Sequence, residues 1–229
     1  MTRTIVVAGY GPGISNAVAE RFGSADFQVA LVARNAARLD EGVRELGAKG
    51  IRAQAFPADL GDPAQARAVI ERVRKAMGPI DTIAWVAYSG GAGDVTKADS
   101  SELRAALEIA TTSLAAAVKE ALPDLRARKG AVLVTNGGFG LFDEKVDAYA
   151  AQIDAMGLSI ANSAKHKLVG LLAPKLRADG VYVGEVMVLS TVKGTAFDTG
   201  GGPSIDAATV GKRFWELHEA RSPTFTQVG

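Results

Sequence analysis

The chain has 229 residues, of which 26 are glycine and none is cysteine, and its formal net charge is +1. A chain of this length fits one globular domain over 1–229, and the lack of cysteine excludes a disulfide framework, a thiolate nucleophile and a cysteine-ligated metal. Because the charge is balanced and only two histidines are present, we expect no nucleic-acid, membrane or metal partner but a small-molecule substrate, in a cytoplasmic protein.

Short apolar segments alternate with amphipathic segments along the whole chain. The apolar segments predict strands over 4–8, 28–33, 51–56, 80–87, 131–135 and 181–189. Their nearly continuous apolar character is typical of parallel strands that are buried on both faces. The amphipathic segments between them predict helices, of which the longest cover 101–122 and 159–177. This alternation predicts a Rossmann-like three-layer α/β sandwich with a doubly wound, mostly parallel sheet.

The junction of the first strand and the first helix carries a glycine-rich loop, Gly9-Tyr10-Gly11-Pro12-Gly13-Ile14. Such a loop lets backbone N–H groups and a helix N-terminus approach a pyrophosphate, where any Cβ would obstruct. The predicted pyrophosphate contacts are Gly9, Gly11, Gly13 and Ile14. The alternative is a tight turn whose glycines bind nothing.

The second predicted strand ends at Arg34, and no carboxylate follows before Asp40. A carboxylate at this point would bind the ribose hydroxyls of NAD, whereas a guanidinium can pair with the 2′-phosphate of NADP. The sequence therefore predicts NADP(H) as cofactor, with Arg34 and Asn35 in contact with it. In the alternative interpretation Arg34 is merely solvated; Asn35 is the N-cap of the next helix in either case.

Three motifs resemble the short-chain dehydrogenase/reductase family: Gly9 to Gly13 followed by Ser15, the pair Asp59-Leu60, and the segment from Ser163 to Leu171 that contains Lys165. The resemblance implies that Asp59 and Leu60 contact the adenine, that Lys165 holds the nicotinamide ribose, and that Ala87 lines the cofactor. It also implies that Thr195 contacts the nicotinamide carboxamide, with a loop or N-cap role as the alternative. A substrate flap is expected at 194–214, and a homodimer or homotetramer through the helices at 101–122 and 159–177.

The family's catalytic groups are largely missing. The resemblance places a tyrosine four residues before Lys165, where this chain has Ala161, a serine near Gly137-Gly138, and an asparagine near Ala110. Ser163 and His166 are expected to point away from the face that carries Lys165, and they receive no role.

The resemblance implies an NADP(H)-dependent oxidoreductase that acts on a small substrate with an atypical proton donor, and three interpretations remain open. Tyr149 or Tyr88 supplies the proton in place of the missing tyrosine, or each simply packs against a pocket wall. Alternatively, the substrate takes its proton from water and needs only a positioned hydride. In the third case the protein binds NADP(H) without turnover, as a sensor or a partner subunit.

Overall fold

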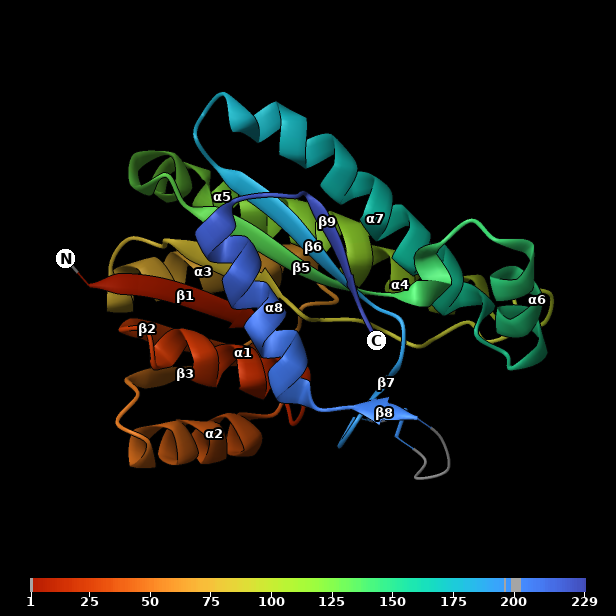
Figure 1. The fold of residues 1–229 in the computed structure, drawn as a ribbon, viewed down its shortest axis with the longest axis horizontal. Helices are drawn as coiled ribbons and strands as arrows, with labels where there is room; N and C mark the ends of the chain where they lie inside the picture. The colour runs from red at the N-terminus through yellow and green to blue at the C-terminus, as the bar shows by residue number, and fades with distance from the viewer. Residues whose placement is uncertain (1, 196, 199–202) are drawn as a thin grey trace.

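The computed structural model describes residues 2–195, 197–198 and 203–229. Its centre is a seven-stranded sheet in which every neighbouring pair is parallel. In spatial order the strands are β3 (Ala53–Pro57), β2 (Phe27–Ala33), β1 (Arg3–Ala8), β4 (Thr82–Trp85), β5 (Ala131–Gly137), β6 (Tyr182–Val188) and β9 (Phe225–Val228) (Figure 1). The chain moves outward from β1 to β3 and then crosses back to β4, so the predicted doubly wound parallel sheet is confirmed.

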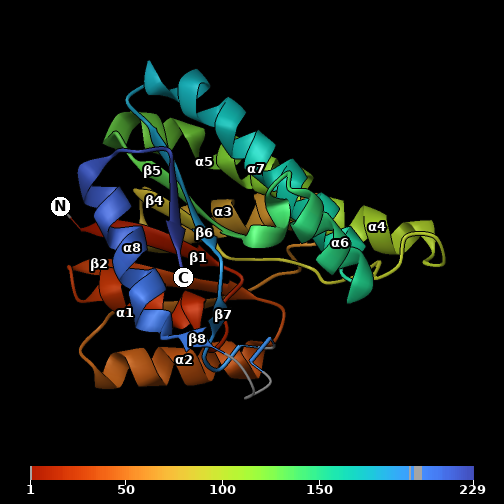
Figure 2. The ribbon, with the colours of Figure 1, turned by 45° about the vertical axis from the view of Figure 1, so that its right-hand side comes forward.

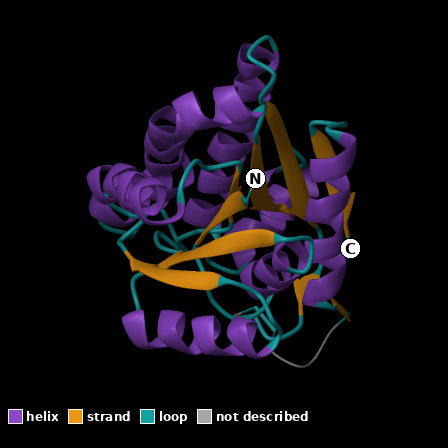
Figure 3. Ribbon diagram, turned by 90° about the vertical axis from the view of Figure 1, so that its left-hand side faces the viewer, coloured by secondary structure: helices purple, strands orange, loops and turns teal. Residues whose placement is uncertain are grey.

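Helices cover both faces of the sheet and complete the three layers (Figure 3). One face packs against α1 (Ile14–Gly23), α2 (Ala36–Ala48) and α8 (Ala207–Ala220). The other packs against α3 (Pro63–Met77), α5 (Ser113–Arg128) and α7 (Met156–Arg177). Each face buries its own apolar core, which explains why the central strands are apolar on both sides. Among the described residues, no helix combines the length and apolar character that a membrane crossing needs.

Local sequence signals set several helix ends. Asn35 caps α2, with its side-chain oxygen accepting a hydrogen bond of 3.0 Å from the backbone N–H of Arg38. Asp62 caps α3 in the same way and is followed by Pro63, which suits the first helical position. Gly78 ends that helix with φ +86°. These boundaries follow directly from residue types whose backbone preferences are strong.

The longer helical segments differ in detail from their predicted form. The helix predicted over 101–122 is divided into α4 (Ser100–Leu107), a π-helical turn η1 (Glu108–Thr112) and α5. The segment before α7 forms a further helix, α6 (Glu144–Gln152), after a short 3₁₀ turn η2 (Gly138–Gly140). Both α4 and α6 extend beyond the carboxyl edge of the sheet (Figure 2).

The predicted flap at 194–214 is only partly irregular. Its described portion follows β7 (Thr191–Val192), includes β8 (Ser204–Ile205), and ends inside α8. Helix α8 packs closely on α1, because a Cβ built on Gly211 would lie 2.8 Å from the carbonyl oxygen of Ala17. Phe214 is fully buried in this contact, so residues 207–214 belong to the sandwich and a flap stays a prediction for 194–206 alone. Residues 196 and 199–202 lie outside the described part of the chain.

Candidate functional site

The glycine-rich loop lies at the carboxyl edge of the sheet, where the ends of β1 and β4 are neighbours. Gly9 has φ +91°, and a Cβ there would lie 2.5 Å from the backbone nitrogen of Ala87. Only glycine allows this approach. The predicted contacts Gly9 and Ala87 therefore meet where the strand order reverses, which is the usual ligand position in a doubly wound sheet.

The second half of the loop is held from two sides. Gly13, with φ +88°, precedes α1, and a Cβ at this position would lie 2.9 Å from the side-chain methyl of Thr195. The buried hydroxyl of Ser15 accepts a hydrogen bond of 2.9 Å from the backbone N–H of Gly11 and donates one of 2.9 Å to its carbonyl. Thr195 itself donates to the carbonyl of Val192 over 2.7 Å. The predicted residues Gly11, Gly13 and Thr195 are thus brought to one place from opposite ends of the chain.

Tyr10, which the sequence interpretation passed over, anchors the loop to α2. Its ring packs against Gly42, where a Cβ would come within 2.4 Å of the hydroxyl. The hydroxyl donates to the side-chain oxygen of Asn16 over 2.9 Å. Burial, aided by nearby glutamates, raises the pKa of Tyr10 to about 12, so the phenol stays neutral and structural.

Two guanidinium groups flank the end of β2. Arg34 is exposed directly after the strand, as predicted. Arg38, in the first turn of α2, was not predicted, yet one of its terminal nitrogens lies 3.8 Å from the position that a Cβ of Gly11 would take. The signal was available in the sequence, because Arg38 falls in the first turn of the helix that begins directly after Arg34 and Asn35. Asn35 is the confirmed N-cap between them.

Asp59 and Leu60 follow β3 at the same edge of the sheet. The Asp59 carboxylate accepts a hydrogen bond of 2.9 Å from the backbone N–H of Gly61. The backbone N–H of Asp59 donates to the side-chain oxygen of Gln65 over 3.1 Å. The Leu60 side chain is buried in the core beside β3. Leu60 therefore contributes packing to this corner, while Asp59 stays half-buried and within the same region as Arg34.

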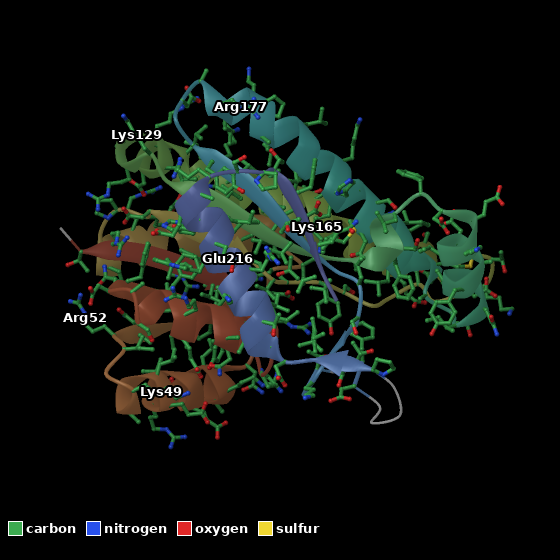
Figure 4. All side chains as sticks on the ribbon, viewed as in Figure 1. Lys49, Arg52, Lys129, Lys165, Arg177 and Glu216 are labelled. Atoms are coloured by element: carbon green, nitrogen blue, oxygen red, sulfur yellow. The ribbon has the colours of Figure 1, made fainter. Side chains whose placement is uncertain are left out.

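Lys165 points into the interior between α7 and the sheet, in contrast to Lys49 and Arg177 at the periphery (Figure 4). It is 3% exposed, and among the described residues its ammonium makes no hydrogen bond or ion pair. Burial lowers the pKa of Lys165 to about 8, and the negative charge of Glu185 opposes that shift. A buried lysine with a perturbed pKa at the ligand edge of an α/β sheet is a candidate functional group.

Small apolar side chains fill the space around the missing catalytic groups. Ala161, four residues before Lys165, packs with Ala106 and Ala110, and all three are buried. Ala110 lies in the π-helical turn η1. Such turns recur at functional sites. We call these three residues the alanine cluster; it leaves no acid on this side of Lys165.

The turn after β5 is equally tight. A Cβ on Gly138 would lie 3.1 Å from the side chain of Leu189, and one on Gly140 would lie 3.0 Å from the backbone of Asn162. A serine at Gly138 would therefore displace Leu189.

Neither candidate tyrosine contacts Lys165. Tyr149 lies on α6, which folds back against α7, but its ring is 54% exposed and faces Phe139 at 6.1 Å. Tyr88 is 46% exposed, and its ring centroid lies 5.8 Å from that of Phe197. Partial burial raises the pKa of Tyr88, which does not favour its ionisation. In the described structure each of the two tyrosines lies beside another aromatic ring.

A buried polar network beneath α7 was missed. Glu185, on β6, is 1% exposed; one carboxylate oxygen accepts from the Asn136 side chain over 2.6 Å and the other lies 2.5 Å from Nδ1 of His166. Asn136 also donates to the carbonyl of Asn162 over 2.9 Å. The sequence did contain a signal for this network: Glu185 interrupts the apolar run 181–189, and a buried carboxylate needs hydrogen-bonding partners. The described residues hold no cluster of three or more metal-ligating side chains.

The chain was compared with known proteins. A family profile described as short chain dehydrogenase matches residues 3–156. The 2,3-dihydro-2,3-dihydroxybenzoate dehydrogenase of Bacillus subtilis is 30% identical over 131 residues, which are 57% of this chain and 50% of that protein. The chain spans less than two thirds of the length of the curated relatives that it matches.

Solved structures share the fold over nearly the whole chain. A short chain dehydrogenase from Burkholderia cenocepacia, solved in complex with NADP, has a TM-score of 0.86 at 22% identity, covering 99% of this chain and 96% of that one. An NADH-dependent reductase responsible for alginate metabolism, A1-R', has a TM-score of 0.84 at 17% identity, covering 99% of this chain and 95% of that one. With the profile match over two thirds of its length, the chain belongs to the short-chain dehydrogenase family.

Proposed function

We propose that the protein binds NADP(H) and acts as an oxidoreductase on a small-molecule substrate. The observation that carries the proposal is the glycine loop: Gly9 and Gly13 have positive φ, and a Cβ on either would collide with Ala87 or Thr195. Only glycine keeps the loop in this tight conformation at the start of α1, where backbone N–H groups can bind a pyrophosphate. Lys165 would hold the nicotinamide ribose and Thr195 the carboxamide, in accord with the family resemblance. The residues present fit the cofactor in charge and in shape.

The preference for NADP(H) over NAD(H) rests on the two guanidinium groups at the end of β2. Arg34 and Arg38 can share a 2′-phosphate, which accepts several charge-assisted hydrogen bonds. Relatives of this fold include the Burkholderia dehydrogenase solved with NADP and a reductase described as NADH-dependent. The fold alone therefore does not decide the cofactor, and the proposal of NADP(H) rests on the two arginines.

Fluorescence titration with NADPH and NADH tests this assignment. Arg34→Leu and Arg38→Leu should each weaken NADPH binding by roughly 10- to 100-fold, because each removes hydrogen bonds to a charged group. NADH binding should stay unchanged in both variants, which makes NADH the internal control. If the unmodified protein binds the two cofactors equally, the arginine argument is wrong.

The chemistry needs a source for the proton. Bound NADPH would supply the hydride, while Lys165 fixes the ribose and Ala161 offers no acid. A polarised C=C bond, conjugated to a carbonyl, suits such a site, because the carbon next to the carbonyl can take its proton from water after hydride addition. We therefore place conjugated enones ahead of simple ketones among the candidate substrates.

Turnover is tested by NADPH oxidation with a panel of enones and ketones. Tyr88→Phe and Tyr149→Phe should leave the rate unchanged if both rings are wall residues; a loss of more than about 100-fold in either variant identifies a substitute acid. The second candidate function, cofactor binding without turnover, is favoured by the alanine cluster. Tight NADPH binding without oxidation by any compound of the panel would support this second function.

The resemblance also implies a homodimer or homotetramer formed through α4, α5 and α7. The exposed side chains of Ile160 and Leu171 on α7 suit such a contact. Light scattering measures the assembly directly, and Leu171→Glu should weaken it if α7 lies in the interface.

A further inference from the structure

A buried carboxylate lies beneath the turn of α7 that carries Lys165. Glu185 and Asn136 come from neighbouring strands and face the same side of the sheet. Asn136 bonds to the backbone of Asn162, and His166 bonds to Glu185. These two contacts place the carboxylate under residues 162–166, so Lys165 lies between the two points at which α7 is tied to this network.

Glu185 is the buried charge opposite Lys165. The charged groups of the neighbouring elements lie at the surface or only half-buried: Glu102 and Arg104 on α4, Glu108 on η1, Glu144, Lys145 and Asp147 on α6, and Lys167 on α7. Among the described residues, the other buried acid is Asp81, which pairs with Arg128 over 2.8 Å at the opposite, amino edge of the sheet.

In the described structure Glu185 makes no direct ion pair with Lys165. Both carboxylate oxygens are already engaged, one by Asn136 at 2.6 Å and one by His166 at 2.5 Å. The carboxylate therefore acts on the Lys165 ammonium through space, inside a region that water does not screen. An open cavity of about 450 Å³ borders this network, and both His166 and Glu185 line it; His166 is the more exposed of the two, whereas Glu185 is 1% exposed.

We propose that Glu185 is a positioning residue for the cofactor site: held by Asn136 and His166, it is the counter-charge that keeps the Lys165 ammonium protonated. The inference rests on the proposed NADP(H) function, in which that ammonium meets the nicotinamide ribose. Burial draws the pKa of Lys165 down to about 8, and Glu185 is the group that resists this shift. Without the carboxylate, the lysine loses its proton inside the neutral range.

Glu185→Gln tests the charge while keeping the shape. The amide oxygen can still accept from Asn136, and the amide N–H can donate to His166 in its other tautomer. In NMR titrations of isotope-labelled lysine, with the Lys165 signal assigned from Lys165→Met, the midpoint of Lys165 should fall by about one pH unit. Should Glu185→Gln not fold, Glu185→Met replaces it as an apolar residue of similar size.

His166→Gln is the matched control. Glutamine at position 166 still offers an N–H donor to Glu185, and the carboxylate stays charged. Because position 166 borders an open cavity, the substitution leaves the hydrophobic core intact. The Lys165 midpoint should stay within about 0.3 pH unit of the unmodified protein. An unchanged midpoint in the neutral Glu185 variant overturns the proposal, and so does an equal fall in His166→Gln, which would mark a structural effect.

NADPH affinity measured against pH gives a second reading. The affinity of the unmodified protein should fall as Lys165 deprotonates above pH ~8, and the same fall should begin about one unit lower in Glu185→Gln. If NADPH does not bind at all, the proposed function fails, while the NMR titration still decides the role of Glu185. If NADPH binds with the same pH profile in both proteins, the proposed function stands and the role of Glu185 is refuted.

Discussion

Replacing Lys165 by methionine should make the protein more stable. The lysine is fully buried, and its pKa falls from the ordinary 10.5 to about 8. At neutral pH, that lowering corresponds to a cost of about 3 kcal/mol for keeping the ammonium charged in the folded state. Methionine has a similar length and no charge to desolvate, and Glu185 keeps its bonds to Asn136 and His166. We therefore expect Lys165→Met to raise the free energy of unfolding at pH 7 by about 3 kcal/mol, or the Tm by roughly 6–12 °C.

The destabilisation by Lys165 depends on pH, and its direction follows from the two pKa values. The pKa of Lys165 in the folded state, about 8, lies below its unfolded value of 10.5, so between these pH values the unfolded chain binds more protons. The destabilisation is complete below pH 8 and disappears as the pH rises toward 10.5. The stability gap between Lys165→Met and the unmodified protein should close over that window.

Urea unfolding at both ends of the window measures the gap, with the fluorescence of Trp85 and Trp215 as the signal. Lys167→Met, two residues further along α7 and exposed, is the control and should change stability by less than about 0.5 kcal/mol. A methionine variant less stable than the unmodified protein at pH 7, or a gap of the same size at both pH values, would refute the reasoning.

Three further substitutions test the loop and the core. Gly13→Ala forces an L-residue to φ +88° and against Thr195; it should cost about 1–2 kcal/mol in urea unfolding and abolish NADPH binding, and normal binding would contradict the loop assignment. Tyr10→Phe removes the hydroxyl that bonds to Asn16, so it should lower the unfolding free energy by about 1 kcal/mol, whereas no change would show that the bond is dispensable. Burial lowers the pKa of His218 to about 4 from 6.5, so the unfolded chain takes up the proton first and stability is lost as the pH falls between these values. In His218→Leu the urea midpoint should change little over that pH range. An equal loss of stability at acid pH in both proteins would exclude His218 as its source.

The sheet was predictable because its central strands are apolar on both faces, whereas the edge strand was not. Strand β9 is only four residues long and half-exposed, so it carries no clear pattern. The break at η1 was equally hidden, because a π-helical turn inserts a residue without interrupting the apolar stripe. Hydrophobic periodicity reflects burial, so it gives no signal where a strand is only partly buried or where a helix is locally unwound.

The site was predictable where a single local segment carries it. The glycine loop and Arg34 follow from short motifs at one strand end, and the structure places both at the carboxyl edge. Glu185 and His166 could not be paired in the same way, because their contact joins a strand to a helix across the fold. His166, which was expected to face away from Lys165 and received no role, instead contacts the buried Glu185 carboxylate beneath α7.

The alanine cluster also limits how this protein can change. Ala106, Ala110 and Ala161 are packed together with almost no exposed surface. A tyrosine introduced at Ala161 alone would have to displace two neighbouring turns of backbone, and overpacking of this kind is itself destabilising. Restoring the family's acid therefore requires several coordinated substitutions, each unfavourable when made alone.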